Sequence, residues 1–271
     1  MVSRNKNQFE QEIAWLLNDK YGGISLSEAK GRTLAAIEKD IALIKAGEPI
    51  DYVIGFSRFL DCKIDLSKKP LIPRTETEYW VEKAITEMEV RKLKLNFKKI
   101  EVKLQLECLD IFAGSGCIGV ALLKNVEHAH VDFAEIDRRL IDQIKKNCEI
   151  NNIAESRYNV IKSNIFAEVV SKYDYIFANP PYCAIKSIKR VQKSVLQYEP
   201  KSAVFGGDDG LAYIRPFIAQ AKNFLKPGGR IYCEFDPAQR GSVERMAKQA
   251  GYSSCEFFTD QFGRWRYFVI Q

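Results

Sequence analysis

The sequence predicts an α/β protein with a mainly parallel β-sheet and helices on both faces of that sheet. From residue 107 to the C-terminus, short apolar stretches alternate with helical patterns, as expected for parallel strands joined by helical crossovers. A glycine-rich turn follows the first of these stretches, as in many nucleotide-binding sheets. The segment 259–264 joins the last two stretches and is too short for a parallel crossover, so we expect the final strand to be antiparallel to its neighbour.

Composition and charge narrow the class of protein further. The chain has 271 residues, 46% of them hydrophobic and 28% charged, which is typical of a globular protein with room for a large and a small domain. No apolar run approaches the roughly 20 residues that cross a bilayer, so we expect a cytoplasmic protein without membrane contact. The net charge of +6 permits a nucleic-acid partner without requiring one.

Cysteine and histidine usage predicts neither disulfides nor a metal site. The seven cysteines are scattered and include no C-x-x-C pair, so we expect them to be reduced. His128 and His130 are close in sequence, but no third ligand accompanies them.

The first 46 residues predict a small helical domain. Apolar residues recur at helical spacing in two stretches: Phe9, Ile13, Leu16 and Leu17, then Leu34, Ile37, Ile41 and Ile44. Between them, Ser25 and Glu28 have the spacing of a capping box and predict the start of the second helix, and Gly47 predicts its end. A domain of residues 1–46 is too small to bury much surface alone, so we expect it to pack on its neighbour and to contact a substrate.

Residues 47–73 predict a β-hairpin linker. The apolar and aromatic stretches 52–56 and 59–64 have the length of short strands. Thr75 and the acidic residues after it predict the start of a helix that extends past Ile85. The basic segment 91–103 follows this predicted helix, and we interpret it as a solvated loop or helix end.

The remaining domain, residues 74–271, carries the predicted sheet. Strands are expected at residues 108–112, 131–134, 159–161, 175–177, 230–234, 256–258 and 267–270. Helices are expected at residues 138–150, 211–225 and 239–249.

A nucleoside cofactor site is predicted along the carboxyl ends of the first strands. Gly114 and Gly116 let the backbone approach a ligand closely, and with Gly119 they also fit the dinucleotide fingerprint. The next strand ends at Glu135, whose carboxylate can accept from both ribose hydroxyls, whereas Asp137 is expected to cap the following helix. Asn164 follows the third strand, where its side chain could meet an adenine edge.

The fourth strand leads into Asn179-Pro180-Pro181-Tyr182, a sequence suited to hold a planar NH2 group. The prolines fix the backbone and remove N–H donors, so the Pro180 carbonyl and the Asn179 side chain can both accept hydrogen bonds. The Tyr182 ring could stack on the flat face of the same group. This arrangement would leave a poor nitrogen nucleophile pointed at an electrophile.

Together these segments resemble the class I S-adenosylmethionine-dependent methyltransferases, and most closely the peptide chain release factor glutamine N(5)-methyltransferases of the HemK/PrmC family. The segments that carry the resemblance are 47–50 with Gly55, 71–78, 110–116, 179–182, 198–200 and 206–211. Asn-Pro-Pro-Tyr alone is shared with methyltransferases that act on adenine or guanine amino groups. The Pro-Arg-x-Glu-Thr-Glu element and the hairpin before it indicate glutamine.

The resemblance implies a Rossmann-like, seven-stranded catalytic domain and S-adenosylmethionine as the cofactor. It implies methyl transfer to the glutamine of the Gly-Gly-Gln motif of a class 1 release factor, with Asn179, Pro180 and Tyr182 as the catalytic residues. The implied cofactor residues are Asp110, Gly114, Gly116, Glu135, Asn164 and Asn179. The implied substrate residues are Asn179, Pro180, Pro181, Tyr182, Arg74 and Glu199. We expect a monomer.

Other functions remain open at the level of sequence. An amino methyltransferase of adenine or guanine in RNA or DNA would use the same motif, although no target-recognition domain is evident. A glutamine methyltransferase of a ribosomal protein would share every motif above. An inactive binding module could retain the fold, although the intact Asn179 and glycines favour an enzyme. Arg74, Glu76 and Glu78 could do no more than cap a helix and pair charges on its surface.

Overall fold

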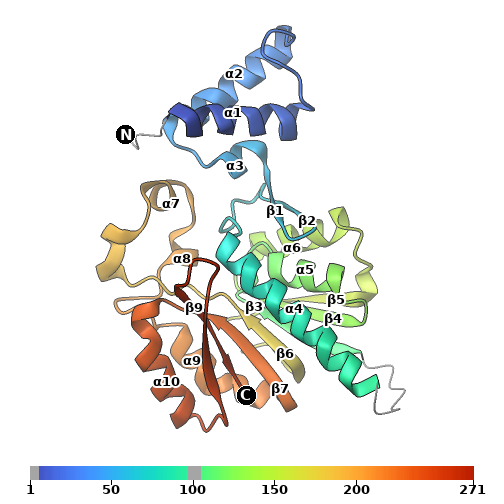
Figure 1. Cartoon of the computed structure of the whole chain (residues 1–271), viewed down its shortest axis with the longest axis vertical. Helices are drawn as coiled ribbons and strands as arrows, with labels where there is room; N and C mark the ends of the chain where they lie inside the picture. The colour runs from blue at the N-terminus through green and yellow to red at the C-terminus, as the bar shows by residue number, and fades with distance from the viewer. Residues whose placement is uncertain (1–5, 97–104) are drawn as a thin grey trace.

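A computed structural model describes residues 6–96 and 105–271 of the chain. Within these ranges a small group of helices stands apart from a larger α/β body, and a short hairpin lies between the two (Figure 1). Residues 97–103 of the basic segment 91–103 lie outside the described part. No helix in the described residues is long and apolar enough to span a membrane.

The body is built on a seven-stranded sheet with the order β5-β4-β3-β6-β7-β9-β8. Its strands are β3 (Leu106–Ile111), β4 (Ala129–Glu135), β5 (Tyr158–Lys162), β6 (Tyr173–Ala178), β7 (Leu225–Glu234), β8 (Cys255–Thr259) and β9 (Trp265–Ile270). Strands β5, β4, β3, β6 and β7 are paired in parallel, while β9 lies antiparallel between β7 and β8. The mainly parallel sheet and the antiparallel final strand, both predicted from the sequence, are confirmed.

Helices cover both faces of this sheet. They are α4 (Thr75–Asn96), α5 (Cys117–Asn125) and α6 (Arg138–Ile150) on one face, and α9 (Ile214–Ala221) and α10 (Arg240–Gln249) on the other. Two shorter helices, α7 (Lys193–Tyr198) and α8 (Lys201–Val204), lie between β6 and α9 in the chain. Short 3-10 turns lie at η1 (Glu155–Arg157), η2 (Ile185–Arg190), η3 (Lys222–Phe224) and η4 (Pro237–Gln239). The predicted helix 211–225 is therefore shorter, because a 3-10 turn and the start of β7 replace its last residues.

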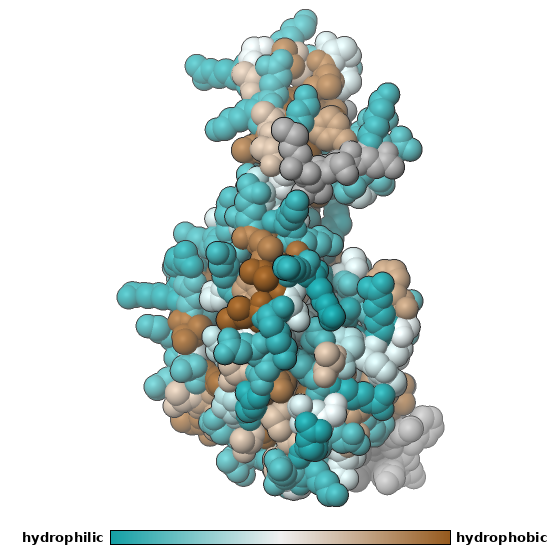
Figure 2. All heavy atoms as spheres, turned by 90° about the vertical axis from the view of Figure 1, so that its left-hand side faces the viewer, coloured by the Kyte–Doolittle hydropathy of each residue, from teal (hydrophilic) through white to brown (hydrophobic). Residues whose placement is uncertain are grey.

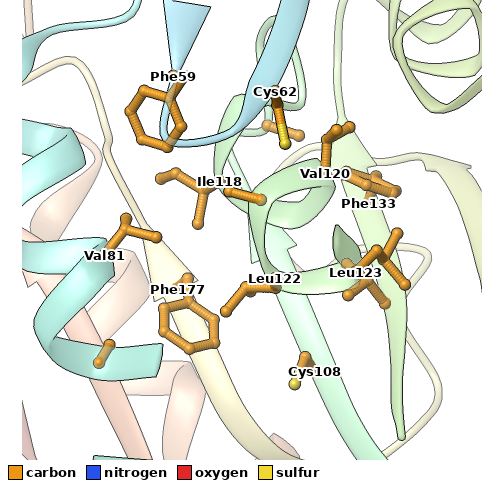
Figure 3. Packing of buried hydrophobic residues seen from close by; sticks show 14 of the residues in the cluster. Phe59, Cys62, Val81, Cys108, Ile118, Val120, Leu122, Leu123, Phe133 and Phe177 are labelled. Carbon is orange, nitrogen blue, oxygen red and sulfur yellow. The ribbon is translucent and has the colours of Figure 1, made fainter. Parts of the chain in front are cut away.

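Alternate residues of the strands enter two different cores, as the pleat of a strand requires. Cys108 and Phe177 pack with α4, α5 and α6 on one face, whereas Leu109 and Ile176 pack with α9 and α10 on the other. In the first core, Phe59 and Cys62 of the hairpin meet Ile118 and Val120 of α5 (Figure 3). The hairpin is thus part of the hydrophobic core of the body.

The N-terminal helices are α1 (Lys6–Tyr21), α2 (Gly31–Ala46) and α3 (Ile50–Ile54), which share a small core around Leu16, Ile44 and Val53. Gly47 ends α2 in a left-handed conformation, as predicted. The expected helix start at Ser25 is wrong. Ser25 and Glu28 do hydrogen-bond, but they close a turn, and α2 begins at Gly31.

The hairpin consists of β1 (Phe56–Phe59) and β2 (Cys62–Asp65). The predicted strand at 52–56 is wrong over most of its length, since residues 50–54 form α3 between Pro49 and the left-handed Gly55. Two asparagine side chains, one in α6 and one at its C-cap, hold β2. Asn147 accepts from the Asp65 backbone N–H at 2.8 Å, and Asn151 bonds both polar groups of the Lys63 backbone, at 3.0 and 2.8 Å. These side chains satisfy backbone groups that another strand would otherwise pair.

Candidate active site

A cleft opens at the carboxyl ends of β3, β4, β5 and β6, with an empty volume of about 1180 Å³ including open solvent. Its wall includes residues from the loop after each strand: Phe112 to Ser115, Glu135 to Asp137, Ser163 to Ile165, and Asn179 with Pro181. Residues 71–74 before α4 and residues from the start of α8 complete the wall. The predicted convergence of four strand ends is therefore present in the fold.

The glycine loop and Glu135 form one hydrogen-bonded unit. Gly114 has a φ of 57° and donates its N–H to Glu135 Oε2 at 2.7 Å, while Glu135 Oε1 accepts from the Asp137 N–H at 2.8 Å. Burial raises the pKa of Glu135, and these backbone donors oppose that shift. Each carboxylate oxygen has a further lone pair, so Glu135 can still accept from ligand hydroxyls.

Gly116 and Asp137 begin the helices on either side of this unit. Gly116 is the N-cap of α5 with a φ of 77°, a conformation that side chains disfavour. Asp137 caps α6 by accepting from the Arg139 N–H at 2.9 Å, which confirms its predicted role.

Asp110 lies under the loop and does not line the cleft. Its Oδ2 accepts from the Gly119 N–H at 2.9 Å, which ties β3 to α5, while its Oδ1 is buried and has no hydrogen-bond partner among the residues that the structure describes. Burial raises the pKa of this carboxyl well above its ordinary value. Direct cofactor contact was expected at Asp110, but its position is one that supports the glycine loop from below.

Asn164 lines the cleft beside Ser163 and Ile165, where the chain turns through a positive φ of 54° at Ile165. Contact of Asn164 with an adenine edge stays a prediction. The cleft is also lined by the aromatic side chains of Phe112 and Tyr213, which the sequence did not identify. Phe112, like Ile165, has a positive φ.

The Asn-Pro-Pro-Tyr motif enters the cleft through only part of its length. Asn179 and Pro181 line the cleft, whereas Pro180 is buried and is not among the lining residues. The Tyr182 hydroxyl donates to Glu234 Oε2 at 3.2 Å and accepts from Arg266 at 3.4 Å. Tyr182 is not among the residues that line the cleft, and the stacking of its ring on a substrate stays a prediction.

A buried carboxylate that the sequence did not single out lies next to this motif. Glu234, at the end of β7, is 1% exposed and accepts hydrogen bonds from Thr77, Trp80 and Tyr182. Thr77 in turn accepts from Asn179 Nδ2 at 3.2 Å. Burial raises the pKa of Glu234, against the effect of its donors. The only sign of Glu234 in the sequence was an acidic residue at the end of a predicted apolar strand. A buried carboxylate at such a position needs hydrogen-bond donors.

Arg74 and Glu199 meet at the edge of the cleft. Arg74 lines it and donates to Glu199 Oε1 at 2.6 Å, and Glu199 Oε2 accepts from the Ile72 N–H at 3.0 Å. Glu78 accepts from the Leu60 N–H at 2.5 Å and thereby links α4 to the hairpin. Glu199 and Glu78 therefore join segments that are distant in the sequence, and they do more than pair charges on a helix surface.

The fold and this cleft define the class of protein: a class I methyltransferase, which uses S-adenosylmethionine. A family model described as the methyltransferase small domain matches residues 93–202. A release factor glutamine methyltransferase of Francisella tularensis subsp. tularensis is 32% identical over 84% of this chain and 76% of its own length. One of Streptococcus pneumoniae is 33% identical over the same shares. The chain belongs to the release factor glutamine methyltransferase family.

A solved structure agrees with this fold. A methyltransferase from Pyrococcus furiosus matches with a TM-score of 0.55 at 18% identity, covering 87% of this chain and 95% of that one. At this identity the likeness concerns the fold alone.

The residues of the cleft fit S-adenosylmethionine. Glu135 has free lone pairs at the β4 end, and Gly114 has no side chain to fill the loop; an added Cβ there would meet no protein atom nearer than 3.9 Å. The apolar wall at Phe112 and Ile165 suits a flat ring. Asn179 lies on the wall of the same cleft.

Proposed function

We propose that this chain transfers the methyl group of S-adenosylmethionine to the side-chain amide nitrogen of the glutamine in the Gly-Gly-Gln motif of a class 1 peptide chain release factor. The observation that carries the proposal is the position of Asn179 at the end of β6, on the wall of the cleft and held by Thr77. The names of the related proteins from Francisella and Streptococcus support the glutamine of a release factor as the substrate.

The chemistry follows from the weakness of an amide as a nucleophile. Its nitrogen lone pair is delocalised into the carbonyl, so the protein must position the NH2 group and stabilise positive charge that develops on nitrogen. In this proposal Asn179 Oδ1, on the wall of the cleft, accepts one of its hydrogens, and Pro181 forms the wall beside it. The carbonyl of Pro180, a residue buried between these two, is proposed as the second acceptor. S-adenosylmethionine, when bound, supplies a methyl group on a sulfonium. With the cofactor bound, the N–C bond would form as the S–C bond breaks, S-adenosylhomocysteine would leave, and the surplus proton would pass to water.

The rest of the cleft holds the cofactor and the substrate in this proposal. Glu135 binds the ribose hydroxyls, Gly114 and Gly116 allow close approach of the backbone, and Asn164 contacts the adenine. Asp110 supports the loop from below, and Arg74 with Glu199 forms the wall on the substrate side.

The domain division is also part of the proposal. Residues 1–46 form a helical domain that contacts the release factor, residues 47–73 link it, and residues 74–271 carry out catalysis as a monomer in the cytoplasm. The separation of the N-terminal helices from the body supports such a role (Figure 1). On the side of the molecule that carries α7, apolar surface gathers on the body just below these helices (Figure 2).

Transfer of labelled methyl from S-adenosylmethionine to purified release factor tests the proposal. We expect label on a factor with the natural Gly-Gly-Gln motif and none on a factor with Gln→Ala in that motif. Bulk RNA in the same assay tests an amino methyltransferase of nucleic acid. Label on RNA, or equal label on both factors, would overturn the proposed substrate.

A further inference from the structure

We infer that Thr77 and Glu234 are positioning residues that fix which end of the Asn179 amide faces the cleft; this inference rests on the function proposed above. An asparagine amide offers a donor at one end and an acceptor at the other. Binding of a substrate NH2 group requires the acceptor, Oδ1, to face the cleft. Something in the protein must therefore hold the Asn179 NH2 group on the opposite side.

The donors around Glu234 fix the direction of its hydrogen bonds. Trp80 Nε1 can only donate, so Glu234 Oε1 accepts at 2.7 Å. Arg266 can only donate, so the Tyr182 hydroxyl accepts from it at 3.4 Å and uses its own proton to donate to Glu234 Oε2 at 3.2 Å. Arg266 is itself anchored by Asp260 at 3.0 Å. Both oxygens of Glu234 are thus acceptors.

The acceptor role of Glu234 determines what the Thr77 hydroxyl can do. Its hydroxyl bonds Glu234 Oε1, and with Glu234 ionised that oxygen can only accept, so the hydroxyl donates its single proton there. Only the lone pairs of Thr77 Oγ1 remain for Asn179, 3.2 Å away. A threonine oxygen with its proton committed can accept from the NH2 end of the amide but cannot donate to the carbonyl end.

These hydrogen bonds determine which end of the Asn179 amide faces the cleft. Because Asn179 Nδ2 is held by Thr77, Oδ1 is the end of the amide left to accept from a substrate. The network reaches Asn179 from buried residues of α4 and β7, so it holds this orientation before any substrate binds. Preorganised polar groups act on the rate of transfer because they need not reorient during the reaction.

Thr77→Val tests the inference, because valine has the shape of threonine without the hydroxyl. We expect kcat for methyl transfer to the release factor to fall about tenfold, as for loss of one hydrogen bond, with little change in the KM for either substrate. Thr77→Ser restores the hydroxyl and should recover most of the rate. Thr75→Val removes an exposed hydroxyl from the same turn of α4 and is the matched control, expected at the wild-type rate.

A double-mutant cycle separates positioning from a merely structural role. In an Asn179→Ala background there is no amide to orient, so Thr77→Val should lower the single-turnover rate by less than about twofold. An equal tenfold loss in both backgrounds would show that Thr77 acts independently of Asn179 and would overturn the inference. So would a wild-type kcat for Thr77→Val in the native background, with folding of each variant checked by its thermal midpoint.

Glu234→Gln provides a second variant that does not depend on Thr77. Glutamine can present its oxygen to Thr77 and Trp80, so we expect kcat within about threefold of wild type; a loss as large as that of Thr77→Val would contradict the acceptor role of Oε1. If wild-type enzyme labels no release factor, the proposed function itself fails. If wild type labels it and Thr77→Val does so equally well, only the positioning role fails.

Discussion

Arg74 and Glu199 form a 2.6 Å ion pair that joins two walls of the cleft across 125 residues of sequence. The Glu199 side chain is 1% exposed, and its other oxygen accepts from the Ile72 N–H. One carboxylate therefore holds the segment before α4 against the segment before α8. This contact couples the stability of the fold to the shape of the site.

Replacement of Glu199 by alanine should destabilise the protein. The change leaves the Arg74 guanidinium and the Ile72 N–H without their acceptor, at a cost of about 2 kcal/mol after allowance for the partial exposure of Arg74. Urea unfolding of both proteins measures this loss. Glu127→Ala, at a side chain that is 85% exposed, is the control and should change the free energy of unfolding by less than about 0.5 kcal/mol. Equal effects of the two changes would refute a structural role of the pair.

Asn179→Ala should lower the rate of methyl transfer by roughly a hundredfold or more, because it removes an acceptor for the reacting NH2 group. Binding of S-adenosylmethionine should remain close to that of the wild type, since Glu135 and the glycine loop are unchanged. Single-turnover transfer and calorimetric titration measure the two quantities separately. A rate near that of wild type would remove Asn179 from the mechanism.

Gly114→Ala should weaken cofactor binding more than it weakens the fold. The left-handed backbone costs about 1 to 2 kcal/mol for a residue with a Cβ, and the new atom meets no protein atom nearer than 3.9 Å. The methyl group would occupy space next to the cleft, so we expect at least a tenfold loss of affinity for S-adenosylmethionine, in line with steric effects on close backbone approach. Gly263→Ala has a φ of 74° and open space, and serves as control. It should cost similar stability and leave cofactor affinity unchanged.

Asp65 should make the docking of the hairpin on α6 sensitive to acid. Burial opposes its ionisation, but hydrogen bonds from Lys146, Ser67 and Gln143 outweigh burial and lower the pKa from 3.8 to about 2. A lowered folded pKa stabilises the protein above pH 4, and this contribution disappears as the pH falls from about 4 to about 2. It amounts to about 2 kcal/mol at pH 7.

Asp65→Asn measures this contribution. The difference in unfolding free energy between the variant and the wild type should be largest at pH 7 and should fall by about half at pH 3. Asp142→Asn, at an exposed position of α6, is the control and should change the free energy of unfolding by less than about 0.5 kcal/mol. A difference for Asp65→Asn that stayed constant from pH 7 to pH 3 would contradict the lowered pKa.

The sheet and the cofactor end of the site were predictable because their signals are local. The apolar stretches that became β3, β4, β6, β7 and β9 each contain a run of buried residues, whereas β5 and β8 are only partly buried. Glu135 ends β4, and Gly114 lies in the loop after β3. The strand predicted at residues 52–54 was wrong because so short an apolar run fits either a strand or a buried helical turn. The flanking Pro49 and Gly55 favour the helix that the structure shows. Spacing alone could not distinguish the two.

The substrate end of the site depends on contacts that no local pattern encodes. Thr77 and Glu234 are 157 residues apart, and only the packing of α4 on the sheet brings them together. The sequence predicted stacking for the Tyr182 ring but gave no sign that its hydroxyl bonds Glu234 and Arg266. Demand for hydrogen bonds at a buried carboxylate thus decided the direction of that side chain.

The measurement that tests the central claim most directly is peptide mapping of release factor after incubation with S-adenosylmethionine and either wild-type or Asn179→Ala enzyme. We predict one added methyl group, located by fragmentation on the glutamine side chain of the Gly-Gly-Gln peptide, with wild-type enzyme and almost none with the variant. A methyl group at another residue, or equal modification by both enzymes, would contradict the assignment of this cleft to glutamine methylation.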